Sequence, residues 1–327
     1  MKFVNITGYA ATGQTALYDL FREFDGYSVP SHFEFVLIKE SYGILDLENF
    51  LIDNWEILRS NTAIKDFLEF CDILNRKGNK FFQFGYNYKE IIHKDFLKYT
   101  EEYVNKLTTC TYMGASMVNL YHKNKFDYFK DKVISKFLNK PNYNKMYISQ
   151  PNYEIFIKET QDYLEKLFYM LSNKGINTMV IDNAIPTSNM EKSLKYFKNI
   201  KMIIVDRDVR DTYVDLVQKK LLIGAELHLE DNVTKYINWA KSMREKTDYE
   251  LPNVMKINFE DLILDYDNTL LKLSEFLEED IQHSRQFEFL DPKISKKNIG
   301  IWKTYSNQDL MNQIFEQIPE YCNNKYD

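Results

Sequence analysis

The chain has 327 residues, of which 44% are hydrophobic and 28% charged, as in an ordinary globular protein. The formal net charge of −6 argues against a general nucleic-acid-binding protein, which needs a basic surface, but leaves room for an anionic ligand in a local basic pocket. The three cysteines are scattered and lack metal-ligand spacing, and no apolar run approaches the ~18–20 residues of a membrane span. The N-terminus begins as a core-like strand, which argues against a signal peptide. These features predict a cytoplasmic protein without disulfides.

The first stretch, residues 2–24, is expected to form a strand, a turn and a helix. A β-prone run leads into a turn bounded by Gly8 and Gly13, and apolar residues at helical spacing follow from Thr15. The first N–H groups of a helix have no intrahelical acceptor and its dipole favours an anion, so this turn is suited to a phosphate. The pattern is G-x-x-x-x-G-Q-T, a Walker-type turn with Gln14 where the lysine is expected. The alternative is a tight turn of an α/β core without a ligand.

A loop over residues 26–30 is expected to lead into a second strand over residues 32–38, with His32 and Glu34 near its start. The next part, residues 46–170, contains little Gly or Pro and much helical periodicity. This composition predicts a large helical insertion within a single domain that spans 1–327. Its helices are expected over 45–58, 64–74 and 155–171, and its loops over 140–145 and 150–152.

After this insertion, buried-strand patterns alternate with helical patterns again. We expect strands over 178–182, 202–206 and 254–257, and helices over 188–198, 232–246 and 266–277. This alternation predicts an α/β fold with a mostly parallel sheet flanked by helices. Ligands of such sheets bind beyond the carboxyl ends of the strands. Four stretches should therefore meet at one edge: the turn at 8–15, a segment beside the 32–38 strand, Asp182–Asn183, and Arg207 onward.

A second signature follows the expected strand over 202–206, where the sequence RDVRDTYVD begins with Arg207. An arginine at a strand end offers two parallel donors to an anion. Together with the turn at 8–15, this run resembles the sulfotransferases that use 3′-phosphoadenosine 5′-phosphosulfate (PAPS). Two further stretches are similar to that family and keep its order: KINFEDLILDYDNTLLKLSEFL over 256–277 and SKKNIGIWK over 295–303. The expected helical insertion is not covered by the resemblance.

The resemblance implies a P-loop-like sulfotransferase fold, PAPS as the donor, 3′,5′-adenosine bisphosphate (PAP) as the product, and no required metal. The turn would hold the 5′-phosphate through backbone N–H groups and the Thr15 hydroxyl, Arg207 would bind the 3′-phosphate, and the 295–303 loop would cover the nucleotide. The residues that the resemblance places at the cofactor are Ala11, Thr12, Gly13, Gln14, Thr15, Arg207, Asp215, Lys296, Lys297 and Asn298.

One departure from the family pattern concerns positive charge. The family has a lysine in the first turn that contacts the transferring sulfuryl group, and Ala11 stands at this position. The positive charge must then come from Lys296 or Lys297 in the 295–303 loop, which we call the late loop, or Gln14 supplies only a neutral hydrogen bond.

Two further departures concern the 3′-phosphate. Asp215 aligns with the family serine that binds this group, and Asn298 stands where the late loop of the family has glycine. Because a carboxylate repels a phosphate, we expect Asp215 to orient Arg207 or to point away.

Sulfuryl transfer to a hydroxyl needs a base, close alignment and positive charge around the transferring oxygens. The family uses a His or a Glu as the base. Glu34 is the preferred candidate because PSHFEF looks like the Glu region of the carbohydrate-acting branch, followed by Asp182 in MVIDNAIP and then His32. Each has a structural alternative: a solvated strand residue for Glu34, a loop cap or arginine partner for Asp182, and a satisfied loop histidine for His32.

The leading hypothesis is a PAPS-dependent sulfotransferase that acts on a hydroxyl of a glycan, a glycan precursor or a small metabolite, with residues 46–170 shaping the acceptor pocket. A catalytically impaired PAP-binding relative is the second hypothesis, because Ala11 removes one catalytic group. A P-loop kinase or NTPase is the third, with Asp182 or Asp206 as the metal-side acid. Gln14 argues against the third, since ATP chemistry in that fold uses the lysine on the phosphates.

Overall fold

The computed structural model describes residues 1–30, 34–79, 83–115, 125–138, 143–172, 175–220 and 232–326. The chain divides into two compact units. We call Met1–Val36 with Ser172–Asp327 the sheet unit, and Leu37–Leu171 the helical unit.

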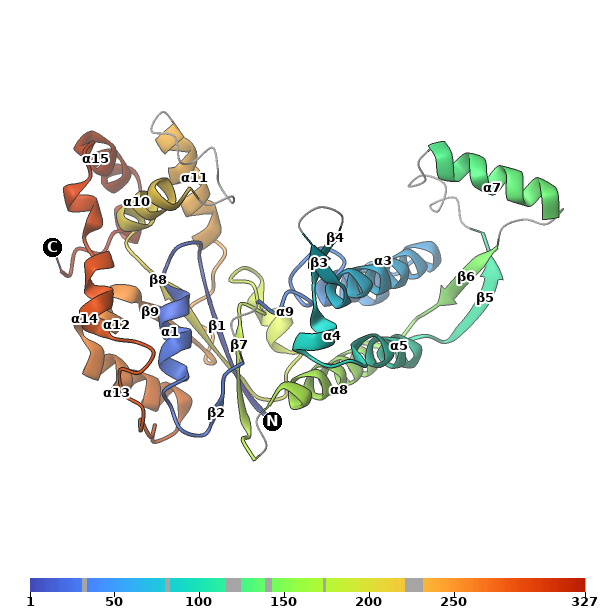
Figure 1. Ribbon diagram of the computed structural model, residues 1–327, viewed down its shortest axis with the longest axis horizontal. Helices are drawn as coiled ribbons and strands as arrows, with labels where there is room; N and C mark the ends of the chain where they lie inside the picture. The colour runs from blue at the N-terminus through green and yellow to red at the C-terminus, as the bar shows by residue number, and fades with distance from the viewer. Residues whose placement is uncertain are drawn as a thin grey trace. The chain divides into compact units, whose positions relative to one another are not determined.

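The sheet unit is built on five parallel strands in the order β2-β7-β1-β8-β9 (Figure 1). Their bounds are β1 Lys2–Gly8, β2 Tyr27–Ser28, β7 Thr178–Asp182, β8 Ile200–Asp206 and β9 Val254–Asn258. The predicted α/β fold with a parallel sheet flanked by helices is therefore confirmed. Because β1 lies at the centre, the turn that follows it lies between the carboxyl ends of β7 and β8.

One face of this sheet packs into an apolar core. Alternate strand residues such as Val4, Ile6 and Val205 pack against helices that follow β1 and β9. These helices are α1 Gln14–Phe21, α12 Phe259–Leu264 and α13 Tyr266–Leu277 (Figure 1). The intervening residues point to the opposite face, where the ring of Phe3 lies 4.9 Å from that of Phe197.

A second core lies beyond the end of β8. It joins α10 Val209–Lys219, α11 Val233–Arg244 and α15 Gln308–Gln317 around Tyr213 and Tyr236. Short elements complete the sheet unit: α9 Met190–Leu194, α14 Pro292–Ser295, and the 3-10 turns η4 Lys296–Asn298, η5 Ile301–Thr304 and η6 Pro319–Tyr321.

The helical unit is centred on three helices, α3 Ile57–Asn75, α5 Phe96–Leu107 and α8 Tyr153–Leu171. The rings of Tyr103 and Tyr163 stack at 4.6 Å between α5 and α8. The other elements of its described residues are two hairpins, a π-helical turn and three further helices. The hairpins are β3 Lys77–Asn79 with β4 Gln83–Tyr86 and β5 Cys110–Gly114 with β6 Asn144–Ile148. The turn is η1 Asn49–Asp53, and the helices are α2 Ile44–Glu48, α4 Tyr88–Ile91 and α7 Lys125–Leu138. The hairpins were not predicted, and β6 replaces part of the loop expected over 140–145.

The strand predicted over 32–38 is wrong over its described part, residues 34–38. Phe35, Val36, Leu37 and Ile38 are buried, as the apolar pattern indicates, but the backbone is irregular at 34–35 and forms a turn over 36–39. The carbonyls at 37 and 38 accept from the N–H groups at 44 and 45, which begin α2. The second strand along the chain is instead β2, which pairs with β7 at one edge of the sheet and lies in the segment where a loop was expected.

The helix predicted over 45–58 is shorter than expected. It ends in η1, and α3 begins at Ile57 because the Glu56 carboxylate accepts from the N–H groups of Leu58 and Arg59. The helix predicted over 188–198 covers only α9. The helix predicted over 64–74 is α3, which begins seven residues earlier than expected, at Ile57. The other predicted strands and helices are found within a few residues of their expected ends.

Candidate functional site

The turn after β1 is closed by Thr12 and Gly13. The hydroxyl of Thr12 donates to the Tyr9 carbonyl at 2.7 Å and accepts from the Tyr9 N–H at 3.1 Å. Gly13 has a φ of +86°, and a Cβ there would lie 2.5 Å from the Phe259 ring, so this position requires glycine. Gly13 is also the N-cap of α1 and gives it no side-chain cap. The first N–H groups of α1 are therefore oriented for an anion.

Gln14 points toward Asp182 at the end of the neighbouring strand β7. Its Nε2 donates to Asp182 Oδ1 at 3.3 Å, while Oε1 lies over Gly8. The backbone carbonyl of Asp182 accepts from the Phe35 N–H at 3.1 Å, which places the preceding residue, the exposed Glu34, at the same edge of the sheet. Both carboxylate candidates for the base thus lie where the parallel strands end.

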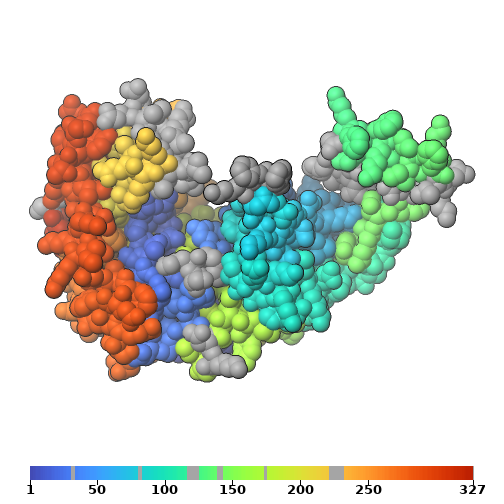
Figure 2. All heavy atoms as spheres, viewed as in Figure 1, coloured from blue at the N-terminus to red at the C-terminus, as the bar shows by residue number. Residues whose placement is uncertain are grey.

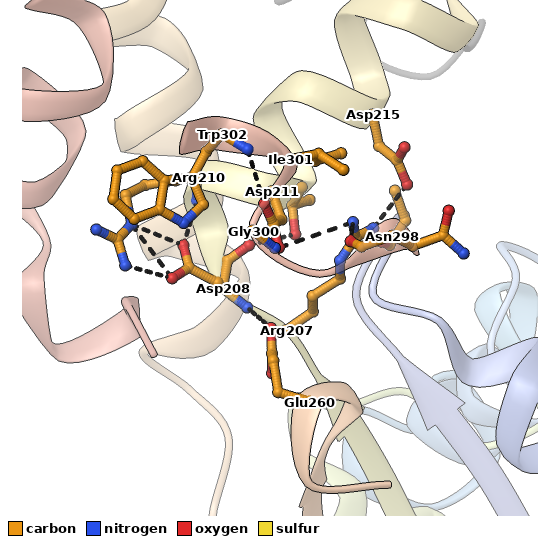
Figure 3. A network of polar contacts seen from close by, with 12 residues as sticks. Arg207, Asp208, Arg210, Asp211, Asp215, Glu260, Asn298, Gly300, Ile301 and Trp302 are labelled. Carbon is orange, nitrogen blue, oxygen red and sulfur yellow. Dashed lines mark hydrogen bonds and ion pairs between the residues drawn. The ribbon is translucent and has the colours of Figure 1, made fainter. Parts of the chain in front are cut away.

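Arg207 connects the sequence motifs that resemble the PAPS-dependent family (Figure 3). It follows β8 and is only 4% exposed. Its Nη1 donates to the Ala11 carbonyl at 3.2 Å and pairs with Asp215 Oδ2 at 2.6 Å, and its Nη2 donates to the Asn298 carbonyl. The guanidinium lies 5.4 Å from the Phe259 ring centre, and its Nε is buried without a partner in the described structure. The turn, α10, the start of α12 and the late loop therefore meet at one arginine.

The late loop is fastened to α10 by Asp211. Its carboxylate accepts from the N–H groups of Gly300 at 2.8 Å and Trp302 at 3.0 Å (Figure 3). Burial raises the pKa of Asp211, against the lowering effect of these N–H groups. Arg210 stacks on the Trp302 ring at 3.7 Å and pairs with Asp208 at 2.6 Å. These contacts hold the loop against Arg207.

Asp206, the last residue of β8, serves as a buried anchor. It pairs with Arg244 at 2.7 Å and with Lys256 at 3.0 Å. Burial alone would raise the pKa of Asp206, but these two cations outweigh it and hold the pKa below its ordinary value. With its oxygens engaged in this way, Asp206 is poorly suited to act as the metal-side acid of a kinase. The residues that the structure describes contain no cluster of acidic, His or Cys side chains suited to a metal.

The structure brings together most of the residues that the sequence predicts for the cofactor. Ala11, Gly13 and Gln14 lie in the turn, and Arg207, Asp215 and Asn298 form the network beside it. Thr12 is buried and its hydroxyl is used within the turn, whereas Thr15 is exposed at the start of α1. Asp215 orients Arg207, which is one of the two expected arrangements.

Three predicted residues lie apart from this network or outside the description. Lys296 and Lys297 are exposed, and the described chain gives neither one an ion pair or hydrogen bond to the turn. Lys296 lines a separate small hollow of about 190 Å³ beside Asp211 and Glu260. His32 lies outside the described residues.

The contacts of Phe259 and the ion pair between Asp206 and Arg244, which support the turn and Arg207, were not predicted from the sequence. Phe259 packs against both Gly13 and Arg207, although its place in NFEDL lies within a motif that was singled out. The ion pair of Asp206 with Arg244 spans 38 positions, and no local pattern indicates such a contact.

Fold and site together define an α/β protein in which a glycine-containing turn and a helix N-terminus lie at the carboxyl edge of a parallel sheet, with a buried arginine beside them. No protein-family model matches the sequence, and no curated protein matches it. Among solved structures, the chain is similar to retinol dehydratase in complex with androsterone and inactive cofactor PAP (13% identity, 98% of this chain, 81% of that chain, TM-score 0.38). It is similar to the sulfotransferase domain of the Synechococcus PCC 7002 olefin synthase (14% identity, 98% and 94% covered, TM-score 0.40).

A third neighbour is the sulfotransferase domain from the curacin biosynthetic pathway (13% identity, 97% of each chain, TM-score 0.42). Several structural neighbours of this chain are thus sulfotransferases. At these identities and TM-scores the likeness assigns neither donor nor acceptor to this chain.

Proposed function

We propose that this protein transfers the sulfuryl group of PAPS to a hydroxyl of an acceptor molecule. One observation carries the proposal: Arg207 contacts or faces all four stretches that resemble the PAPS-dependent family, through Ala11, Asp215, Phe259 and Asn298. These stretches are far apart in the sequence, and a nucleotide site is a physical reason for them to meet.

In this proposal the nucleotide uses two anion sites. The N-terminus of α1 holds the 5′-phosphate through backbone N–H groups, and Arg207 binds the 3′-phosphate through its two-nitrogen fork. To bind the 3′-phosphate, Arg207 has to give up its ion pair with Asp215. Asp215 Oδ2 already accepts from Lys219 at 2.9 Å as well, so the carboxylate keeps a cationic partner when a phosphate takes the arginine.

The reaction forms a bond between the acceptor oxygen and sulfur while the bond from sulfur to the PAP phosphate oxygen breaks. A carboxylate takes the proton of the acceptor hydroxyl. The contact with Gln14 supports Asp182 in this role, because the amide donor fixes the carboxylate next to the turn. Glu34 is the second candidate at the same edge. Because Ala11 carries no charge, the leaving oxygens depend on backbone donors or on Lys296 or Lys297 brought over by the bound nucleotide.

The acceptor, a carbohydrate or a small molecule, is assigned in this proposal to the segment 46–170. The helical unit has a hollow of about 450 Å³, and its lining combines apolar residues such as Phe50 and Leu58 with polar residues that include Asp46, Glu56 and Arg59. This volume and mixed lining are typical of small-molecule sites.

The base is tested by removing each carboxylate without changing its shape. We expect Asp182→Asn to lower sulfuryl transfer from PAPS by about 10²–10⁴-fold, the usual contribution of a general base, with PAP affinity close to that of the wild type. Transfer of labelled sulfate to a panel of sugar, phenol and alcohol acceptors measures turnover, and calorimetry measures affinity.

Two variants make this test specific. Asp267→Asn removes an exposed carboxylate of α13 and should leave turnover unchanged. A loss in Glu34→Gln with normal turnover in Asp182→Asn would move the role to Glu34, and normal turnover in both would contradict the carboxylate base.

A nucleotide-binding relative without catalysis is a second candidate. It is favoured by one observation: Ala11 stands where the family has a lysine, and among the described residues no lysine forms a hydrogen bond or ion pair with the turn in its place. Tight PAP binding by the wild type, with no transfer to any acceptor of the panel, would select this candidate.

A further inference from the structure

The helix α7, in the helical unit, exposes an unusual apolar stripe. Phe126, Phe129 and Phe137 are 74%, 66% and 86% exposed, and Phe137 is the most exposed large hydrophobic residue of the described chain. With Val133 they are spaced three and four residues apart, so they share one side of the helix. A stripe of this kind in water indicates a surface that is covered in the functional state.

Lysines border this stripe, and the acidic residues lie opposite. Three exposed lysines lie beside Phe129 along the helix: Lys132 is three positions from it, Lys125 four and Lys136 seven. Asp127 and Asp131, four residues apart, lie on the opposite side. Residues 123–145 contain seven lysines and two aspartates, a net charge of +5 in a chain whose net charge is −6. The positive charge is thus concentrated where the apolar side chains are.

We propose that α7 binds the surface of an anionic phospholipid bilayer, lying parallel to it with the phenylalanine stripe in the interface. Helices with an apolar stripe and a lysine-rich border bind in this way, and clusters of four to eight basic residues favour anionic lipids. The lysine stems lie along the apolar region while their ammonium groups contact the phosphates. The inference is independent of the proposed sulfuryl transfer.

The length of α7 fits this position. Its 14 residues are about 21 Å long, shorter than the ~30 Å hydrocarbon core, so the helix can lie in the interface but cannot cross it. No helix of the described ranges is long and apolar enough to traverse a bilayer. Figure 2 shows the surface of α7 in light green.

The hairpin of β5 and β6, into which α7 is inserted, also exposes apolar side chains next to basic ones. Met113 of β5 is 63% exposed and lies opposite Lys145 of β6, and Tyr143, just before β6, is 51% exposed. Apolar and basic side chains therefore occur together on the strands that lead to and from α7.

A second copy of this chain is a less suitable binding partner for α7 than an anionic lipid surface. A symmetric pairing of two α7 helices would bring their lysine borders together, and like charges oppose such a contact. One helix of this length also buries far less area than a stable dimer needs. An anionic lipid surface, in contrast, is complementary to the basic border.

Vesicle sedimentation with the full chain tests the proposal. We expect binding to mixed phosphatidylcholine–phosphatidylglycerol vesicles, weaker binding at high salt, and none to pure phosphatidylcholine. Changing Lys125, Lys132 and Lys136 to Gln should lower the partition coefficient on the order of 100-fold. Changing Phe126, Phe129 and Phe137 to Ser should abolish it.

Matched controls separate a local effect from a change in overall charge or apolarity. Lys89→Gln/Lys94→Gln/Lys98→Gln removes three exposed lysines of the same unit, and Phe84→Ser/Leu271→Ser removes apolar residues that are 69% and 65% exposed. Both should bind as the wild type does.

A third variant, Phe129→Trp, keeps the stripe apolar and should show a blue-shifted emission with anionic vesicles only. Three outcomes would overturn the proposal: no binding to any vesicle, equal losses in the control variants, or a dimer in sedimentation analysis that the Phe→Ser changes abolish while lipid binding is absent.

Discussion

Arg207→Ala is expected to weaken PAP binding by about 1.5–3 kcal/mol, or roughly 10–150-fold, the size of a hydrogen bond to a charged group. Arg207 contacts the turn, α10 and the late loop together, and its fork is the proposed ligand of the 3′-phosphate. Calorimetric titration with PAP at a temperature below the unfolding range measures the loss.

The reverse change is expected at the partner of this arginine. In Asp215→Ser the carboxylate no longer competes for Arg207, so PAP should bind more tightly than it does to the wild type. Arg76→Ala, which removes a partly exposed arginine of the helical unit that also pairs with an aspartate, is the matched control and should have no effect. Wild-type affinity in Arg207→Ala would contradict the proposed 3′-phosphate site.

Asp206→Asn is expected to destabilise the protein by about 3–5 kcal/mol, because it leaves the guanidinium of Arg244 buried without its counter-charge. The change also breaks the support of the turn, since Arg244 lies 4.3 Å from the Tyr9 ring centre. Chemical unfolding of wild type and variant at neutral pH gives the difference in the free energy of unfolding.

The same pair predicts a pH dependence. The pKa of Asp206 is lower in the folded protein than in the unfolded chain, so its contribution is present above the unfolded pKa and is lost as the pH falls through the folded pKa. The difference between wild type and Asp206→Asn should therefore stay constant above about pH 5 and shrink below about pH 4. Asp267→Asn, at an exposed position, is the control. A difference that grows on acidification would contradict this role of the ion pair.

The sequence predicted those parts of the candidate site that follow from the parallel direction of the strands. Parallel strands place their carboxyl ends at one edge, so the segments after β1, β7 and β8 had to meet there, and the contacts of Gln14 with Asp182 and of Arg207 with Ala11 confirm it. The resemblance added the late loop, whose Asn298 carbonyl contacts the same arginine.

The remaining features depend on contacts that sequence pattern does not encode. The run from Phe35 to Ile38 is buried on all sides, and a buried turn has the same composition as a buried strand. The two-residue strand β2 is too short to give any alternation. In the helical unit, Glu56 caps α3 and interrupts a pattern that otherwise continues from Leu45 to Leu58. The hairpins there contain few apolar residues at alternate positions, so helical periodicity dominated the prediction.

The most direct test of the proposed function is nucleotide binding without metal. We predict that PAP, in the presence of EDTA, binds in calorimetry and stabilises the protein by about 2.7 kcal/mol at a ligand concentration 100 times its dissociation constant. ATP with magnesium should give a much smaller effect, because Gln14 replaces the Walker lysine and Asp206 is engaged by Arg244. Stabilisation by ATP with magnesium but not by PAP would contradict the account.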